Sequence, residues 1–241
     1  VAGKLYPEGV TTNSEDGVND IPALYPVFER MAKEEFILCL HGERPGVFSL
    51  DRETAFLPVL EEIATRFPNL KIVLEHVTTE AAVELVKKLP DTVAATITVH
   101  HLYLTLDDVI GDKIRPHHFC KPVAKRPEDR AALLAAATSG NPKFFLGTDS
   151  APHAVETKEC EAGCAGVYTA PVAIPLLAEI FERQNALDQL EGFTSFFGAE
   201  WYGLPPNAAH ITLQKQEWIV PDRCGTVVPF RAGKKLTWKV T

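Results

Sequence analysis

The sequence predicts an α/β fold built on a parallel sheet, and three observations carry this prediction. Short apolar runs alternate with longer stretches in which apolar residues recur with helical period. Runs that are apolar throughout suit strands covered on both faces, as the strands of parallel sheets are. Polar residues with metal-binding chemistry follow several of these runs at intervals of about 36 residues, the length of a strand-helix unit.

Four strands are expected from the apolar runs. They cover residues 36–40 (FILCL), 70–74 (LKIVL), 93–99 (VAATITV) and 143–146 (KFFL). A further strand is expected at the start of the chain, where it ends near Lys4 in the segment KLYP.

Helices are expected between these strands. Residues 21–35 and 51–67 carry apolar side chains at positions i, i+3, i+4 and i+7, which is the pattern of an amphipathic helix. Thr78-Thr79-Glu80 provides capping chemistry for a third helix that runs through Lys88. Further helices are expected over residues 127–138, 171–184 and 187–197.

The pattern changes after about Leu204. Residues 210–220 and 226–240 have the aromatic and β-branched content of strands, separated by a turn. We expect one domain, in which residues 1–204 form the α/β part and residues 205–241 form a small β segment packed on it.

Composition excludes several functional classes. The hydrophobic content of 46% and charged content of 23% are those of a globular protein, and no apolar run approaches the roughly 20 residues of a membrane span. A net charge of −8 argues against a nucleic-acid or anionic-membrane surface. Five scattered cysteines in a chain of this size favour a reduced, cytoplasmic setting.

Four polar residues stand at the ends of predicted strands: Lys4, His41, His76 and Asp149. The successive spacings are 37, 35 and 73 residues, the last about twice the repeat. Because ligands gather at the carboxyl ends of parallel strands, we expect these side chains to converge. Imidazoles and a carboxylate bind zinc, so the set indicates a divalent-metal hydrolase. Lys4 fits such a set only if it is modified, for example by CO₂ to a bridging carboxylate, or has another role.

Five ordered motifs resemble the dihydroorotases, and more narrowly the shorter, monofunctional type of bacteria and fungi. They are KLYP with TTNS, LHGE, LEH with TT, RPH, and LGTDSAPH, at residues 4–14, 40–43, 74–79, 115–117 and 146–153. The similarity extends to NAL at residues 185–187 and VPF-x-AG at residues 228–233, so it covers essentially the whole chain. Dihydroorotases belong to the amidohydrolase superfamily, and the resemblance therefore implies a (β/α)₈ TIM barrel with two zinc ions.

The resemblance also implies roles for the four strand-end residues. Carboxylated Lys4 would bridge the two zinc ions, and His41 and His76 would hold one of them. Asp149 would bind the other ion and act as general acid and base, moving a proton between the attacking water and the ring nitrogen of dihydroorotate. In the biosynthetic direction, N-carbamoyl-L-aspartate would close to the ring in pyrimidine biosynthesis.

Further residues match positions that bind substrate in the family. His153 would bind the substrate carboxylate, and main-chain groups at Ala165 and Lys121 would contact the substrate, although the family usually has leucine in place of Lys121. Thr11 and Thr12 match the tip of a mobile loop that closes on substrate. The pairs at residues 100–101 and 117–118, both His-His, are expected near the site without binding zinc.

One signature of the family does not occur in these 241 residues. It is His-x-His-x-Arg, which the family carries at the end of its first strand. Eight units of about 36 residues need about 288, and the last expected barrel helix ends near residue 203, which leaves room for five strands. We therefore expect an N-terminally truncated chain, without strands one to three, that begins at Val1 rather than at a methionine.

The resemblance further implies a small-molecule substrate, a homodimer and a cytoplasmic location, with no nucleic-acid or membrane partner. Two alternatives stay open. One is a hydantoinase or dihydropyrimidinase, although the motifs TTNS and APH favour an acidic substrate. The other is a non-catalytic dihydroorotase-like partner of another pyrimidine enzyme, which the missing signature favours and the retention of all four strand-end residues opposes.

Overall fold

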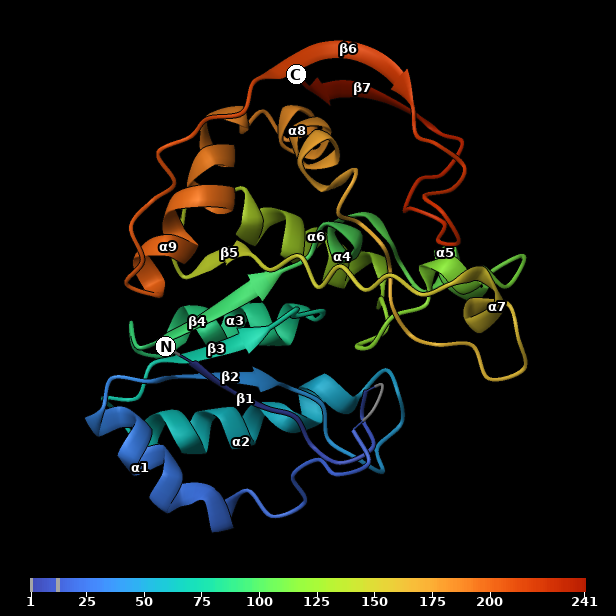
Figure 1. The fold of residues 1–241 in the computed structure, drawn as a ribbon. Helices are drawn as coiled ribbons and strands as arrows, with labels where there is room; N and C mark the ends of the chain where they lie inside the picture. Colours follow the sequence, from blue (N-terminus) through green and yellow to red (C-terminus); the bar gives the residue numbers. More distant parts are fainter. Residues whose placement is uncertain (1, 12–13) are drawn as a thin grey trace.

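The computed structural model describes residues 2–11 and 14–241, and five parallel strands run through its centre (Figure 1). Each strand pairs with the next one in chain order, as consecutive strand-helix units do. The strands are β1 (Ala2–Leu5), β2 (Ile37–His41), β3 (Ile72–Glu75), β4 (Val93–Ile97) and β5 (Phe144–Leu146). The predicted parallel α/β fold is confirmed.

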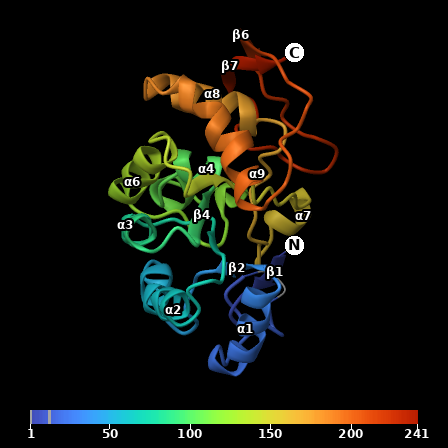
Figure 2. The same ribbon diagram turned by 90° about the vertical axis from the view of Figure 1, so that its left-hand side faces the viewer.

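Longer helices follow the strands, and Figure 2 shows α2, α3 and α6 along one side of the sheet. The longer helices are α1 (Tyr25–Lys33), α2 (Arg52–Arg66), α3 (Glu80–Lys88), α6 (Pro127–Ala137) and α8 (Ala173–Arg183). Four short ones are α4 (Val99–Tyr103), α5 (Asp107–Ile110), α7 (Val155–Lys158) and α9 (Phe197–Trp201). Single turns of 3₁₀ helix cover Pro22–Leu24, Pro116–His118 and Leu187–Gln189, and a π-helical turn covers Gly192–Phe196. The predicted cap of α3 is present, because Thr79 Oγ1 accepts from the Ala82 N–H at 3.2 Å.

Successive side chains of a strand point to opposite faces, which gives the sheet an outer and an inner face. Leu38 and Leu40 of β2 lie in the large core that the strands share with the helices. Ile37 and Cys39 lie in a smaller cluster on the other face. Its other members are Val73, Ala94 and Phe145, and Phe197, Trp201 and Tyr202 pack against it. The α9 segment therefore covers part of the inner face.

Several predicted elements differ in extent from the structure, including the following three. The strand expected over residues 93–99 ends at Ile97, because the Thr98 side chain accepts from the His101 N–H and starts α4. The single helix expected over residues 187–197 is instead divided into the 3₁₀, π and α9 turns. The strand expected over residues 226–240 begins only at residue 235, because tertiary contacts hold the residues before it in turns and bridges.

The last two strands form a separate antiparallel pair, β6 (Leu213–Ile219) and β7 (Lys235–Val240), which arches over α8 (Figure 1). The buried Glu179 of α8 accepts from the main-chain N–H and the hydroxyl of Thr237 in β7. The assignment of residues 205–241 to the same domain stays a prediction. Within residues 2–11 and 14–241, no helix combines the length and the apolar character needed to cross a membrane.

Candidate active site

Two of the four predicted strand-end residues, Lys4 and His41, lie on the inner face of the sheet together with Glu75. In the register of the sheet, Lys4 pairs with Cys39, and His41 pairs with Glu75. Cys39 belongs to the inner cluster, and His41 follows it by two positions, so Lys4, His41 and Glu75 share that face. The Lys4 ammonium donates to the Glu75 carboxylate across β2.

His76 and Asp149 depart from strand alternation. His76 follows Glu75 directly, so strict alternation would turn its side chain to the outer face. Instead the backbone of His76 has φ +45° and that of Asp149 has φ +40°, both in the left-handed region that few side chains other than Asn, Asp and His enter. His76 follows β3 and Asp149 follows β5 at the same end of the sheet, and two strand-end residues in this costly conformation are typical of a functional site.

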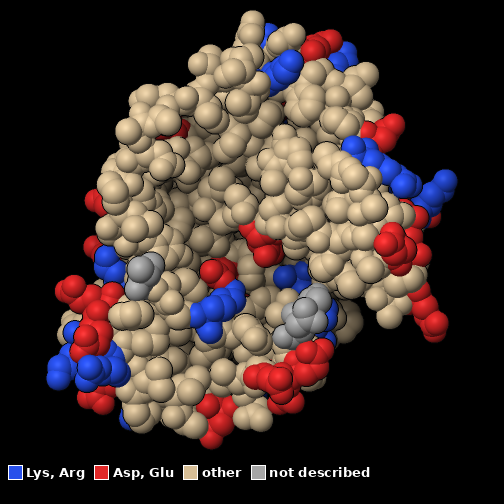
Figure 3. Space-filling view, viewed as in Figure 1, with Lys and Arg blue, Asp and Glu red and all other residues tan. Residues whose placement is uncertain are grey.

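A cavity of about 380 Å³ brings these groups together. Lys4, His76 and Asp149 line it, with Glu75, Thr96, Phe145, Leu146, Gly147, Thr148, Gly198 and Tyr202. His41 lies beside them, with its ring centroid 4.7 Å from that of His76 in an edge-to-face arrangement. Figure 3 shows acidic and basic side chains together where the middle of this face is hollowed. The residues predicted from strand-end spacing therefore share one site.

Two hydrogen bonds fix the histidine pair. His41 Nε2 lies 2.9 Å from the Glu43 carboxylate, and both side chains are buried. The main-chain N–H of His76 donates to Thr96 Oγ1 at 2.8 Å. A carboxylate partner of this kind orients the imidazole of a metal-binding histidine.

Glu53 of α2 anchors the segment that follows His76. Its buried carboxylate accepts from the main-chain N–H and the hydroxyl of both Thr78 and Thr79, at 2.6–3.0 Å. The negative charge also lies at the N-terminus of α3, where the helix dipole favours it. Five hydrogen bonds to one carboxylate thus hold the segment that follows His76.

The cavity holds groups of the kind that bind a divalent metal ion. Burial raises the pKa of Asp149, while the charges of Lys4 and His41 oppose this shift. Burial also lowers the pKa of Lys4 and, together with the His41 ring, places the pKa of His76 well below its ordinary value. Nδ1 of His76 is buried and has no hydrogen-bond partner among residues 2–11 and 14–241. A neutral imidazole with a free nitrogen and a carboxylate in the same cavity fit a divalent metal ion.

The predicted substrate contacts form a second group around Gly166. A methyl group on Gly166 would lie 2.7 Å from Cδ2 of His153, so this ring packs directly against the loop that contains Ala165. The Gly166 N–H donates to the Phe119 carbonyl at 2.8 Å, which joins that loop to the segment leading to Lys121. The structure therefore brings together the chain segments that contain residues 121, 153 and 165, and the substrate contacts themselves stay a prediction.

The predicted mobile loop is only partly described. Thr11 lies in a bend, where its N–H donates to Ser14 Oγ and its carbonyl accepts from the same hydroxyl. Thr12 lies outside the described residues. Thr11 is not among the residues that line the cavity, so its substrate role stays a prediction.

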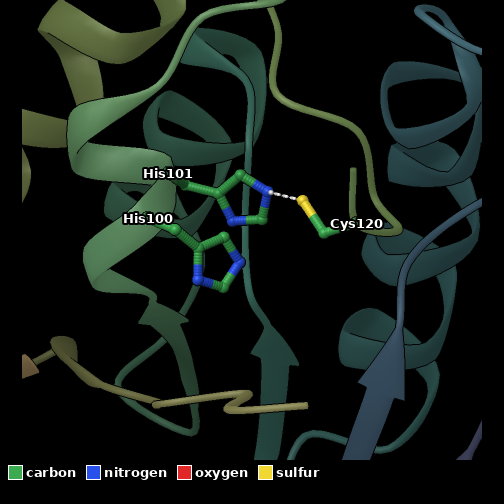
Figure 4. A group of neighbouring side chains, drawn as sticks. All are labelled: His100, His101 and Cys120. Carbon is green, nitrogen blue, oxygen red and sulfur yellow. Dashed lines mark hydrogen bonds between the residues drawn. The ribbon is translucent and has the colours of Figure 1, made fainter. Parts of the chain in front are cut away.

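A second cluster of metal-binding side chains lies at His100, His101 and Cys120 (Figure 4). These side chains are buried, and one ligand atom from each lies within 4.8 Å of the others. Both ring nitrogens of His101 already have partners, Thr98 Oγ1 and the Pro122 carbonyl, each at 2.9 Å. Burial raises the pKa of Cys120 to about 12, which keeps the thiol protonated. We therefore interpret the cluster as structural.

Several functional partners were missed in the sequence analysis. Glu75 and Glu43 stand inside motifs that were recognised, yet no role was assigned to either. Their proximity to Lys4 and His41 follows from strand register and from a tight turn after β2, which periodicity alone does not give. Thr96 and Glu53 carry no signal in the sequence, because their partners lie 20 to 26 residues away.

Comparisons with known proteins place the chain in a family. No protein-family model matches it. A dihydroorotase of Shewanella denitrificans is 54% identical over 246 residues, which cover 99% of this chain and 72% of that protein. A dihydroorotase of Teredinibacter turnerae is 52% identical over 247 residues, with 100% and 72% covered.

Solved structures similar to this chain also include dihydroorotases. The Saccharomyces cerevisiae dihydroorotase in complex with 5-fluoroorotic acid is 45% identical, with a TM-score of 0.91 over 99% of this chain and 72% of the other. An L-hydantoinase of Arthrobacter aurescens, at 17% identity and a TM-score of 0.82, shares the fold alone. The predicted amidohydrolase barrel is thereby confirmed, with five of its strands in the described residues. With half of its residues identical over 72% of the length of known dihydroorotases, this chain belongs to the dihydroorotase family.

Proposed function

We propose that the residues of this chain form most of the active site for the dihydroorotase reaction, the reversible hydrolysis of L-dihydroorotate to N-carbamoyl-L-aspartate, and that strands carrying the His-x-His-x-Arg signature complete it. The observation that carries the proposal is the cavity at the strand ends, where Lys4, His76 and Asp149 meet beside His41. This constellation lies in a chain that is 54% identical to a dihydroorotase. The likeness to hydantoinases is one of fold only, so it favours no second substrate.

We propose two zinc ions in the complete site. Lys4, in carboxylated form, would bridge them, His41 and His76 would hold one, and Asp149 would bind the other. Carboxylation requires a neutral amine, and the burial that lowers the pKa of Lys4 favours that form. The metal ions would supply Lewis-acid polarisation of the amide carbonyl and a water of lowered pKa.

Asp149 moves the proton in this proposal. Its carboxylate takes a proton from the water that attacks the ring carbonyl, and it then delivers the proton to the nitrogen that leaves as the C–N bond breaks. A carboxyl group whose pKa is raised by burial holds a proton more readily than a solvated one, which suits this exchange. In the biosynthetic direction the same group removes the proton from the attacking nitrogen.

The second group of residues would orient the substrate. His153 would bind the substrate carboxylate, and the main chain at Lys121 and Ala165 would hydrogen-bond the ring. The loop with Thr11 and Thr12 would close over the cavity. We further expect a homodimer in the cytoplasm, as the family resemblance implies.

The test uses a fusion, because the His-x-His-x-Arg signature does not occur in these 241 residues. The stretch of the Shewanella denitrificans relative that precedes the region similar to this chain is placed before Val1. We expect zinc-dependent hydrolysis of dihydroorotate, and Asp149→Asn is expected to lower kcat by about 10²–10⁴-fold. Asp188→Asn, at an exposed aspartate, is the matched control. A folded, zinc-loaded fusion that leaves dihydroorotate unchanged would refute the proposal.

A further inference from the structure

Lys158, at the end of α7, is a buried cation outside the proposed metal centre. Its side chain is 3% exposed, and its ammonium donates to three main-chain carbonyls. These are Phe119 at 3.0 Å, Cys164 at 2.8 Å and Gly166 at 2.7 Å. An ammonium has three N–H donors, so this one is fully used.

The three carbonyls belong to two separate segments of chain. Phe119 lies two residues before Lys121, while Cys164 and Gly166 flank Ala165 on both sides. The Phe119 carbonyl also accepts from the Gly166 N–H at 2.8 Å, so one oxygen joins both segments and the ammonium. The Lys158 ammonium therefore connects the two main-chain segments by hydrogen bonds.

Gly166 also contacts the third predicted substrate-binding residue, His153. Gly166 packs so closely on His153 and Ala151 that an added methyl group would lie 2.7–2.8 Å from them. Gly166 therefore lies against the His153 ring, and it is held by its own N–H bond to Phe119 and by the bond from Lys158 to its carbonyl. A shift of this glycine would move the ring and the Ala165 main chain together.

We propose that Lys158 is a positioning residue for substrate: by holding the carbonyls of residues 119, 164 and 166, it fixes the spacing between the main-chain groups of Lys121 and Ala165 that grip the ring. This inference rests on the proposed function. It assigns Lys158 no contact with substrate, because all its donors are used within the protein. Burial lowers its pKa to about 8, which leaves it mainly protonated at pH 7.

The kinetic signature of this role differs from that of a catalytic residue. Contacts to the unreacting part of the ring are made equally in the ground state and the transition state, so their loss raises KM and leaves kcat nearly unchanged. In the fusion described above, Lys158→Met removes the three donors and keeps an unbranched side chain. We expect KM for dihydroorotate to rise about tenfold and kcat to change less than about threefold.

Lys143 provides a matched control. It is also a buried lysine, and its ammonium donates to the Leu89 carbonyl at 2.6 Å, away from the substrate segments. Lys143→Met removes the same charge and is expected to leave KM unchanged. Lys158→Arg, which keeps a cation with several donors, is expected to recover most of the affinity.

A second measurement needs no activity. In the 241-residue chain, amide hydrogen exchange at Gly166 is expected to accelerate at least tenfold in Lys158→Met and to stay unchanged in Lys143→Met. If the Met variant does not fold, the Arg variant is measured in its place, with a smaller acceleration expected. Unchanged exchange, or a fall in kcat at constant KM, would overturn the inference. An inactive parent fusion would instead refute the proposed function and leave the exchange result to decide the role of Lys158.

Discussion

Glu53 provides the sharpest test of how the fold supports the site. Its carboxylate is the acceptor for two main-chain N–H groups and two hydroxyls, at Thr78 and Thr79, and all of these groups are buried. Glu53→Ala removes this acceptor and leaves the donors in a space that water does not fill readily. The change should therefore destabilise the whole chain and loosen the turn that carries His76.

The magnitude follows from the number of donors. Each buried N–H left without a partner costs about 1–3 kcal/mol, so two cost about 2–6 kcal/mol, while the hydroxyls can rotate toward other acceptors. Glu53→Gln keeps one acceptor oxygen and turns an amide toward a hydroxyl that can accept from it. We expect the glutamine variant to lose only about 1–2 kcal/mol.

The assay is urea denaturation at pH 7, followed by zinc titration of the folded variants. Glu179→Ala is the control, because Glu179 is an equally buried carboxylate that accepts from Thr237 in β7, far along the chain from the metal ligands. Both alanine variants should lose stability, but only the Glu53 variant should bind zinc about tenfold more weakly. A Glu53→Ala protein that loses less than about 1 kcal/mol would refute this reasoning.

Three further results are expected. The pKa of His101 is lowered to about 3 by burial, so the unfolded chain binds its proton first as pH falls. Below pH 6.5 this histidine should lower the free energy of unfolding by up to about 1.4 kcal/mol for each pH unit. His101→Gln should reduce this pH dependence, as measured by urea denaturation at pH 7, 6 and 5. Gly147→Ala places a methyl group 2.6 Å from the Thr96 hydroxyl, which accepts from the His76 N–H. The variant should lose about 1–3 kcal/mol of unfolding free energy and some zinc affinity. An unchanged urea midpoint would contradict this contact. A polypeptide of these 241 residues alone should hold fewer than two zinc ions tightly and turn over little dihydroorotate, as measured by atomic absorption and a hydrolysis assay; two tight ions with normal turnover would count against the assigned ligands.

The sequence predicted the existence of the strands better than their partners. Apolar runs and the repeat of about 36 residues were enough to place Lys4, His41, His76 and Asp149 at one end of a parallel sheet. The reason is that residues directly after successive parallel strands all lie at the carboxyl edge of the sheet. The ion pair between Lys4 and Glu75 was not predictable in the same way, since it depends on the register of three strands.

Tertiary contacts account for the other differences. Residues 226–234 have strand-like composition, but they are held in turns. The Phe230 N–H donates a hydrogen bond to the Tyr168 carbonyl, and main-chain hydrogen bonds form an isolated β-bridge between Cys224 and Val227. Lys158 resembles any surface lysine of a short helix, and only the fold reveals that it is buried among three carbonyls. Local pattern does not report such long-range neighbours.

The left-handed backbone at His76 and Asp149 narrows what can replace these residues. A substitute must bind a metal ion and must also accept a positive φ, and the side chains that do both are nearly the same short set of Asn, Asp and His. Glutamate or cysteine could supply a ligand atom but would add backbone strain, whereas glycine would relieve the strain and supply no ligand. A saturation library at either position should therefore recover far fewer working variants than one at His41, which lies within β2.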